Sequence, residues 1–262
     1  MTATIVDGKA LARAWLDDIA AQVRVLSAPL HLAAVCAGGD EGLKKFVALK
    51  QKAAQSMGIT FSSYFFDAND EVGARATLQY LAADDDVHGI FVELPLPNAW
   101  DTDALLAFIP SGKDVDALTR DARVPAPAVR ALEYLLDEYG IDTHGLDAAV
   151  VGSGKLVGAP IAAWLTSHGA AVDVVDVDTG NPSSVTSRVD LVVCGAGVPK
   201  LVDGRWIKEG TTVIDFGYSD GVGDVDGASV IKKAGLLTPV PGGMGPLVIV
   251  AVLENLLMLS TS

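Results

Sequence analysis

Cysteine is scarce in this sequence: 262 residues contain only two, Cys36 and Cys194. Each lies in a short apolar run that is typical of a buried strand, so we expect free, buried thiols and no disulfide bond. Structural disulfides belong to oxidising compartments, and their expected absence favours a reducing one. We therefore expect a cytoplasmic protein.

Basic residues are also few. The chain has 19 lysine and arginine residues against 33 aspartate and glutamate residues, which gives a formal net charge of −14. Nucleic-acid phosphates require a basic surface, so this balance argues against a nucleic-acid partner. An acidic surface fits either high solubility or a salty cytoplasm, and the composition does not separate the two.

Long apolar runs are missing as well. No stretch is long enough to span a bilayer, although 50% of the residues are hydrophobic. The N-terminal stretch MTATIVDGKALARAWLDDIA lacks the basic-then-apolar pattern of a secretory signal. We expect no membrane partner, and a chain that can form one large α/β domain or two smaller ones.

The first part of the chain alternates strand patterns with helix patterns. Apolar runs typical of strands occur at 30–36, 59–66 and 89–94. Helical spacing of apolar residues occurs before the first run and between the others, at 11–23, 42–58 and 72–81. Strands that alternate with helices indicate a parallel sheet with right-handed crossovers.

A glycine-rich loop opens the second part of the chain, in the sequence AAVVGSGKLVGAP at 148–160. The pattern predicts a strand, a glycine turn and a helix, which is the geometry that brings a backbone close to a dinucleotide pyrophosphate. The spacing from Gly152 to Gly158 is one residue longer than the usual fingerprint, however. An ordinary strand-to-helix turn fits this loop as well.

Three more strand patterns follow, at 171–175, 190–194 and 211–216. The first ends at Asp176, where a carboxylate suits the ribose hydroxyls of NAD and repels the 2′-phosphate of NADP. A solvated acidic turn is the alternative there. The later strand ends carry glycines, and such ends gather at the ligand-binding edge of an open parallel sheet. The predicted cofactor-binding residues are Gly152, Ser153, Gly154, Asp176, Ala196 and Gly197.

The candidate catalytic residues centre on Lys50, which lies four positions after Phe46 on a predicted helix. An amine beside an aromatic plane suits a flat ring ligand, although a core phenylalanine with an exposed lysine fits the helix pattern at least as well. Glu93 lies in an apolar strand and needs a partner, for which Lys50 is the natural candidate. Asp114 and Asp116 occupy a polar loop, where they either bind a heterocycle or face solvent.

These patterns predict a two-domain α/β protein. The expected boundary lies near residue 120, with a catalytic domain at 1–119 that a C-terminal helix at 246–262 completes. The second domain, at 120–245, is expected to be a Rossmann-type parallel sheet that binds NAD or NADP.

Four segments resemble the bifunctional methylenetetrahydrofolate dehydrogenase/cyclohydrolase family: FVALKQKAAQSMGI, GIFVELPLP, PSGKDVDAL and TPVPGGMGPL. With VVGSGKLVGAP and VIDFGYSDGVGDVDG in the right order, the similarity spans nearly the whole chain. The resemblance implies a homodimer with folate in the cleft between its domains. It also implies oxidation of 5,10-methylenetetrahydrofolate by hydride transfer to NAD or NADP, and hydrolysis of the methenyl product to 10-formyltetrahydrofolate in one-carbon metabolism.

The resemblance implies roles for single residues too. Lys50 falls on the family's essential lysine, and Asp116 falls on the aspartate that holds the pterin. Pro241, Gly242 and Gly243 match the loop that closes over the folate. No metal is expected. The implied catalytic residues are Lys50, Glu93 and Asp116, and the implied substrate-binding residues are Phe46, Pro241, Gly242 and Gly243.

Two departures from the family pattern surround Lys50. Phe46 stands where the family has tyrosine, and Glu93 stands where it has glutamine. A carboxylate beside Lys50 raises the pKa of the amine and opposes a role as general base, so hydrolysis is the activity in question.

Further departures affect the cofactor. Ser153-Gly154 replaces Arg-Ser and Asp176-Val177 replaces His-Ser, which removes groups associated with NADP and favours NAD.

Two alternatives to the folate enzyme stay open. One is a related dehydrogenase for a modified pterin or a shikimate-like acid, and the other is a catalytically silent folate- or nucleotide-binding relative.

Overall fold

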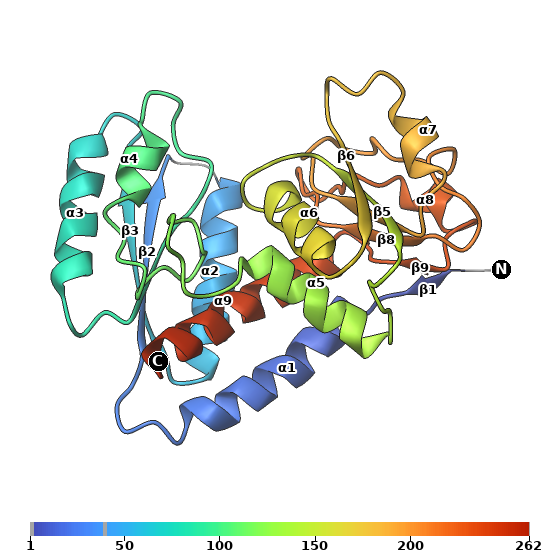
Figure 1. The fold of residues 1–262 in the computed structure, drawn as a ribbon. Coiled ribbons are helices and arrows are strands. Elements are labelled where there is room, and N and C mark those ends of the chain that lie inside the picture. The colour runs from blue at the N-terminus through green and yellow to red at the C-terminus, as the bar shows by residue number, and fades with distance from the viewer. Residues whose placement is uncertain (1–2, 39–40, 262) are drawn as a thin grey trace. The chain divides into compact units, whose positions relative to one another are not determined.

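The computed structural model describes residues 3–38 and 41–261, which form two compact units (Figure 1). The small-sheet unit comprises Ala14–Pro127 and Ile249–Ser262, and the large-sheet unit comprises Met1–Arg13 and Ala128–Val248. Among the described residues, no helix is long and apolar enough to cross a membrane. The predicted α/β architecture with two parallel sheets is confirmed.

The first and last helices of the described chain are each divided between the units. Helix α1 (Gly8–Val23) and helix α9 (Met244–Ser260) each cross a boundary between the units, near Arg13 and Val248 respectively. Helix α9 starts in the large-sheet unit, and its residues from Ile249 onward belong to the small-sheet unit. The end of the chain therefore returns to the unit that holds most of the first half of the sequence.

The small-sheet unit is built on three parallel strands in the order β3-β2-β4. The strands are β2 (His31–Ala37), β3 (Thr60–Phe66) and β4 (Gly89–Val92). Its helices are α2 (Glu41–Ser56), α3 (Glu71–Ala83) and the short α4 (Thr102–Leu106). Gly58, with φ of +79°, lies just past the end of α2 and allows the chain to turn into β3.

Opposite faces of this sheet meet different partners because side chains alternate along a strand. Ile90 and Val92 of β4 belong to a core cluster that also contains residues of α3 and α4. Gly89 lies on the other face, where an added Cβ would be 2.6 Å from Leu256 Cδ1 of α9. Residues 91 and 93 follow Gly89 at the same period and share its face, which places Glu93 on the side away from α3.

The large-sheet unit contains six parallel strands in the order β1-β9-β8-β7-β5-β6. The strands are β1 (Thr4–Ile5), β5 (Asp147–Val151), β6 (Ala171–Val175), β7 (Leu191–Cys194), β8 (Thr212–Asp215) and β9 (Leu236–Leu237). Its helices are α5 (Pro127–Glu138), α6 (Gly158–Ser167), α7 (Pro182–Thr186) and α8 (Gly227–Val230). Helix α5 begins at a proline, whose missing N–H is harmless in the first turn.

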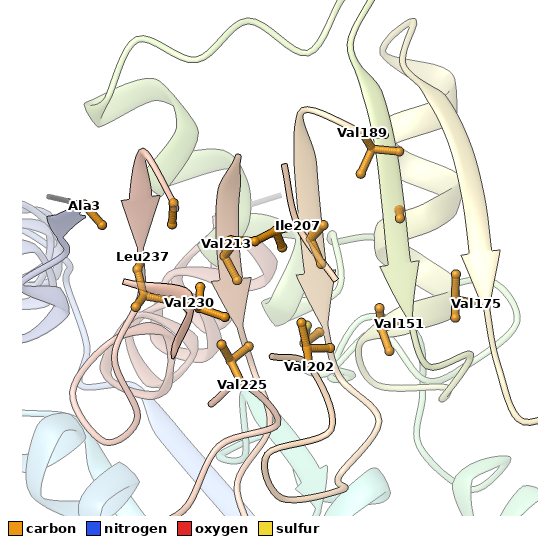
Figure 2. Packing of buried hydrophobic residues seen from close by; sticks show 14 residues of the cluster. Ala3, Val151, Val175, Val189, Val202, Ile207, Val213, Val225, Val230 and Leu237 are labelled. Atoms are coloured by element: carbon orange, nitrogen blue, oxygen red, sulfur yellow. The ribbon is translucent and has the colours of Figure 1, made fainter. Parts of the chain in front are cut away.

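Valine dominates the core on one face of the large sheet (Figure 2). Val151, Val192 and Val213 come from the neighbouring strands β5, β7 and β8, and all three are at most 2% exposed. Val225 and Val230, from the segment after β8, pack into the same cluster. β-Branched side chains fit a pleated, buried surface, so this run of valines holds the strands and the loops after them in fixed positions.

The structure differs from the expected division at the start of the chain. Thr4 and Ile5 pair with Leu236 and Leu237 of β9, so they extend the large sheet and do not join the unit expected at 1–119. Both residues are exposed, and a two-residue strand has no alternation that the sequence could reveal.

Candidate functional site

A buried ion pair links α2 to the end of β4. Lys50 Nζ donates to Glu93 Oε2 at 2.8 Å, and the two side chains are only 11% and 15% exposed. Helix α2 presents Lys50 toward the sheet face that carries Glu93. The expected partnership is therefore confirmed, and its cause is the cost of leaving a lone carboxylate inside an apolar strand.

An aromatic ring lies beneath this amine. Lys50 Nζ is 4.1 Å from the centroid of the Phe91 ring, within the range of a cation–π contact. Phe91 is absent from the predicted site residues, although it precedes Glu93 by two positions and the alternation of the strand puts both on one face. Phe46 lies one turn before Lys50 on α2 and is partly buried. Its expected contact with a ring ligand stays a prediction.

The carboxylates around Lys50 set its charge. Burial alone would lower the pKa of Lys50, but Asp116 and Glu93 together reverse this effect and the pKa of Lys50 is raised. Burial also raises the pKa of Asp116 to about 6, against the opposing influence of Lys50 and with further increases from Glu93 and Asp114. At neutral pH Lys50 is therefore a cation, which suits a hydrogen-bond donor and not a proton acceptor.

The loop that carries Asp116 is tied to the rest of its unit. Ile90 N donates to Lys113 O at 2.7 Å, which attaches the loop to β4. The Lys113 ammonium donates to three backbone carbonyls at and beyond the end of α3, those of Leu81, Ala82 and Asp84. A lysine at a helix C-terminus satisfies carbonyls that have no partner within the helix.

Asp114 supports the same loop from within. It is 1% exposed, and its Oδ2 accepts a hydrogen bond from Thr119 N at 2.7 Å. The structure thus separates the two loop aspartates: Asp114 is used inside the loop, whereas Asp116 belongs to the charge cluster of Lys50 and Glu93.

Both cysteines are free and buried, as expected. Cys36 lies on β2 near the charge cluster, where burial and the Glu93 charge raise the pKa of its thiol to about 12. The pKa of Cys194 is raised as well, chiefly by burial. Both thiols stay protonated at neutral pH, which excludes a thiolate nucleophile at these positions.

The large-sheet unit contains a second site, at the edge where its strand order reverses. Strands β6 and β7 lie on opposite sides of β5, and ligands of open parallel sheets bind outside the carboxyl ends at such a point. The loops after β5 and β7 meet there, since a Cβ on Gly152 would lie 2.7 Å from Gly195 O. A Cβ on Gly158 would overlap the carbonyl of Gly152. Only glycine allows this close approach of backbone to backbone.

This arrangement fits a dinucleotide. Gly152 N donates to Val175 O at 2.8 Å, which fixes the start of the glycine loop. Helix α6 begins after Val157 with no side chain capping its first turn, so the helix N-terminus is available to an anion. Ser153 and Gly154 are exposed in the loop between them. The cradle that glycine opens and the uncapped helix start together match a pyrophosphate.

Asp176 lies at the carboxyl end of β6, as the sequence predicts, and is exposed. Its Oδ1 accepts hydrogen bonds from Asp178 N at 3.0 Å and from Thr179 Oγ1 at 3.2 Å. One carboxylate oxygen is therefore engaged within the turn itself. This engagement orients the side chain at the position where a dinucleotide presents its ribose.

Ala196 and Gly197 follow β7, and both of their N–H groups donate to one side chain, that of Asp224. The sequence predicts no such role for the acidic, glycine-rich segment around Asp224. A hydrophilic stretch next to glycines resembles a surface loop, and only the fold shows that Asp224 is 1% exposed.

The loop of Pro241, Gly242 and Gly243 joins β9 to α9 in the large-sheet unit. Gly242 has φ of +102°, and a Cβ on Gly243 would lie 2.5 Å from Pro239 O. Both glycines are thus required by the backbone of the loop. Their expected role in substrate binding stays a prediction.

Comparison with known proteins matches both units to one family. A family model described as tetrahydrofolate dehydrogenase/cyclohydrolase, catalytic domain, matches residues 6–116, and one described as its NAD(P)-binding domain matches residues 126–262. The bifunctional protein FolD of Chloroflexus aggregans is 35% identical over 283 residues, covering 100% of this chain and 99% of that protein.

Solved structures of the same family resemble this chain over nearly its whole length. The bifunctional FolD enzyme of Campylobacter jejuni has a TM-score of 0.92 at 33% identity, covering 98% of each chain. The Trypanosoma brucei FolD structure, described as a complex with NADP cofactor and inhibitor, has a TM-score of 0.94 at 31% identity. It covers 100% of this chain and 98% of its own.

Proposed function

Because this chain belongs to the tetrahydrofolate dehydrogenase/cyclohydrolase family, we propose that it oxidises 5,10-methylenetetrahydrofolate to the methenyl form and hydrolyses that product to 10-formyltetrahydrofolate. The observation that carries the proposal is the buried Lys50 cation, which Glu93 holds at 2.8 Å and Asp116 influences electrostatically. A desolvated cluster of titratable groups is a hallmark of a catalytic site.

The charge cluster suits the chemistry of the folate bridge. Loss of a hydride leaves a positive charge shared by the bridge carbon and its two nitrogens, and the carboxylates of Glu93 and Asp116 stabilise developing positive charge nearby. Lys50 donates hydrogen bonds and orients both the bridge region and the water that attacks the methenyl carbon. Asp116 is largely ionised above pH 6 and accepts hydrogen bonds from the amino groups of the pterin.

A nicotinamide dinucleotide, when bound, supplies the hydride acceptor. Gly152 and Gly158 let the backbone approach its pyrophosphate, and the N-terminus of α6 faces that charge. Ala196 and Gly197 border the same edge of the sheet. We further propose that NAD is preferred over NADP, because the exposed carboxylate of Asp176 accepts hydrogen bonds from ribose hydroxyls and repels a 2′-phosphate.

The deciding experiment measures oxidation of methylenetetrahydrofolate with NAD and with NADP in parallel, together with hydrolysis of the methenyl compound. We expect dehydrogenation with both cofactors, faster with NAD, and hydrolysis above the buffer rate. The Asp176→Ser variant should narrow the difference between the cofactors. Equal use of NAD and NADP by the unmodified chain would remove the role of Asp176.

The assay also separates the alternatives. Turnover of a modified pterin or a shikimate-like acid, with none of methylenetetrahydrofolate at any salt concentration, would favour the related dehydrogenase. Tight folate binding without turnover of either kind would favour a catalytically silent relative. The retention of Lys50 inside a buried ion pair supports the active enzyme.

We propose a homodimer in a reducing, cytoplasmic compartment. Two buried thiols support the compartment, and the edge strand β3 with its half-exposed Phe65 supports association. Sedimentation equilibrium tests the dimer, and a monomer at micromolar concentration would contradict it.

For the division of labour we keep residues 1–119 with 246–262 as the folate-binding part and 120–245 as the dinucleotide-binding part. Residues Thr4–Ile5 depart from this division structurally, since they add a strand to the large sheet.

A further inference from the structure

A buried carboxylate fixes the turn after β7. Asp224 is 1% exposed, and its Oδ2 accepts hydrogen bonds from Ala196 N at 2.6 Å and Gly197 N at 3.0 Å. One charged oxygen that accepts from two consecutive N–H groups constrains the peptide between them. Gly197 has φ of +68°, a conformation that other residues rarely adopt.

A second buried carboxylate fixes Asp224. Asp215 ends β8, and its Oδ1 accepts hydrogen bonds from Gly217 N at 2.8 Å and Asp224 N at 3.2 Å. Its Oδ2 accepts from Val225 N at 3.0 Å. Asp215 therefore holds the backbone on both sides of the Asp224 side chain, and the two carboxylates together receive five backbone N–H groups.

Backbone pairing attaches the same segment to the chain beyond the turn. Lys200 N donates to Gly223 O and Val202 N donates to Asp224 O, each at 2.9 Å. The segment thus binds both ends of the turn that follows β7. Glycines make room for this arrangement, because a Cβ on Gly217 would overlap the Asp224 carboxylate and a Cβ on Gly223 would overlap that of Asp215.

We propose that Asp224 is a positioning residue for dinucleotide binding, which holds the Ala196–Gly197 turn in the shape that the cofactor requires. The turn adjoins the glycine loop, since a Cβ on Gly152 would lie 2.9 Å from Ala196 Cα. Both loops follow strands at the point where the strand order reverses. The proposal rests on the proposed function in assuming that a nicotinamide dinucleotide is the ligand of this edge.

Removal of the Asp224 carboxylate leaves the N–H groups of Ala196 and Gly197 without their acceptor. Such groups find new partners by rotating their peptides, and a rotated turn no longer matches the glycine loop across from it. Asp224 does not discriminate between the two dinucleotides, because it contacts backbone and not ligand. Its loss should weaken NAD and NADP binding by the same factor.

The test is calorimetric measurement of the Kd for NAD and for NADP with the full chain. Asp224→Ala should raise both values by about tenfold or more, the effect of losing two charge-assisted hydrogen bonds. Asp224→Asn should have a smaller effect, because an amide oxygen still accepts. Gly217→Ala should reproduce the Asp224→Ala effect by displacing the carboxylate. Asp220→Asn is the matched control, since it removes one exposed charge from the same segment.

Hydrolysis of the methenyl compound serves as the readout that this role should not move, because Lys50, Glu93 and Asp116 belong to the other unit. The proposal would be overturned if Asp224→Ala bound both dinucleotides with Kd values within twofold of those of the unmodified chain. It would also be overturned if Asp224→Asn and Gly217→Ala lost hydrolysis to the same extent as they lost dinucleotide binding. If the unmodified chain binds dinucleotide but oxidises no folate, the proposed function fails and the Kd comparison still decides the role of Asp224.

Discussion

Each unit contains an aspartate whose pKa is raised to about 6 by desolvation, yet the two are stabilised in different ways. Asp116 in the small-sheet unit is opposed chiefly by a side-chain cation, Lys50. Asp215 in the large-sheet unit is opposed chiefly by backbone N–H groups, those of Val225 and Gly217. A lysine side chain is mobile and can change its charge during a reaction, whereas a backbone amide is uncharged and part of the main chain. The first arrangement therefore suits chemistry, and the second suits a fixed binding surface.

Replacement of Lys50 should have the largest effect, because it removes the cation that distinguishes the site of the small-sheet unit. In Lys50→Met, Glu93 and Asp116 lose their cation, and we expect hydrolysis to fall by about a hundredfold or more. Loss of one partner of a buried ion pair should also lower the unfolding free energy, by about 3 kcal/mol. Absorbance assays and thermal unfolding measure the two effects.

The control for this variant is Lys52→Met, which removes an exposed lysine from the same helix. It should leave both quantities unchanged. Hydrolysis by Lys50→Met within fivefold of the unmodified chain would refute the assignment of Lys50.

The next largest effect should come from the glycine loop. A methyl group in Gly158→Ala would overlap the Gly152 carbonyl, so the loop must shift and overpacking of this kind destabilises by about 1 to 3 kcal/mol. We expect the Kd for both dinucleotides to rise by about tenfold or more while hydrolysis continues. Gly180→Ala is the control, because an added Cβ there meets nothing within 4 Å. Loss of hydrolysis in folded Gly158→Ala would show that the two regions are not independent.

Elements with a clear hydrophobic period could be predicted from the sequence, and so could contacts that follow from the local pattern alone. A carboxylate in an apolar strand requires a partner, and Lys50 proved to be that partner of Glu93. The long parallel strands and helices emerged within a few residues of their observed bounds. β1 and β9 have two residues each, too few to show any alternation.

Other features depend on the tertiary fold and could not be predicted. The role of Asp224 arises because β7 and β8 are neighbours, which brings the acidic segment after β8 beneath the turn after β7. Nothing in the local pattern distinguishes its carboxylate from solvated ones nearby, such as exposed Asp220. Backbone donors carry no sequence signature, so a side chain that binds them is recognised only in the structure.

A change at Glu93 tests the ion pair through the pH dependence of hydrolysis. Glu93 raises the pKa of Lys50, so Glu93→Gln should lower that pKa. In a plot of hydrolysis rate against pH, the limb that reports the titration of Lys50 (the Lys50 limb) should therefore move to lower pH. The control Glu41→Gln, at an exposed position of α2, should leave the limb in place. An unmoved limb in Glu93→Gln would mean that the ion pair does not govern the reaction.

The smallest effect should be on the pH dependence of stability. The pKa of Asp215 is about 6 in the folded chain and 3.8 ordinarily, so the folded chain binds this proton more readily than the unfolded chain does. Ionised Asp215 therefore opposes folding above pH 6, and its contribution to the unfolding free energy should rise as the pH falls from about 7.5 toward 4. The pKa of Asp116 is also raised to about 6, so its contribution to the unfolding free energy should likewise rise as the pH falls.

Thermal unfolding at about pH 7.5 and pH 5.5 should show this gain in the unmodified chain, and Asp215→Asn should reduce it. Asp116→Asn should reduce it too, but it should also shift the Lys50 limb of the hydrolysis profile to lower pH, because Asp116 raises the pKa of Lys50. Asp215→Asn should leave that limb unmoved. An unchanged gain in Asp215→Asn would mean that the N–H groups of Gly217, Asp224 and Val225 keep Asp215 ionised throughout this range. Asp116 and Asp215 would then differ in charge as well as in their partners.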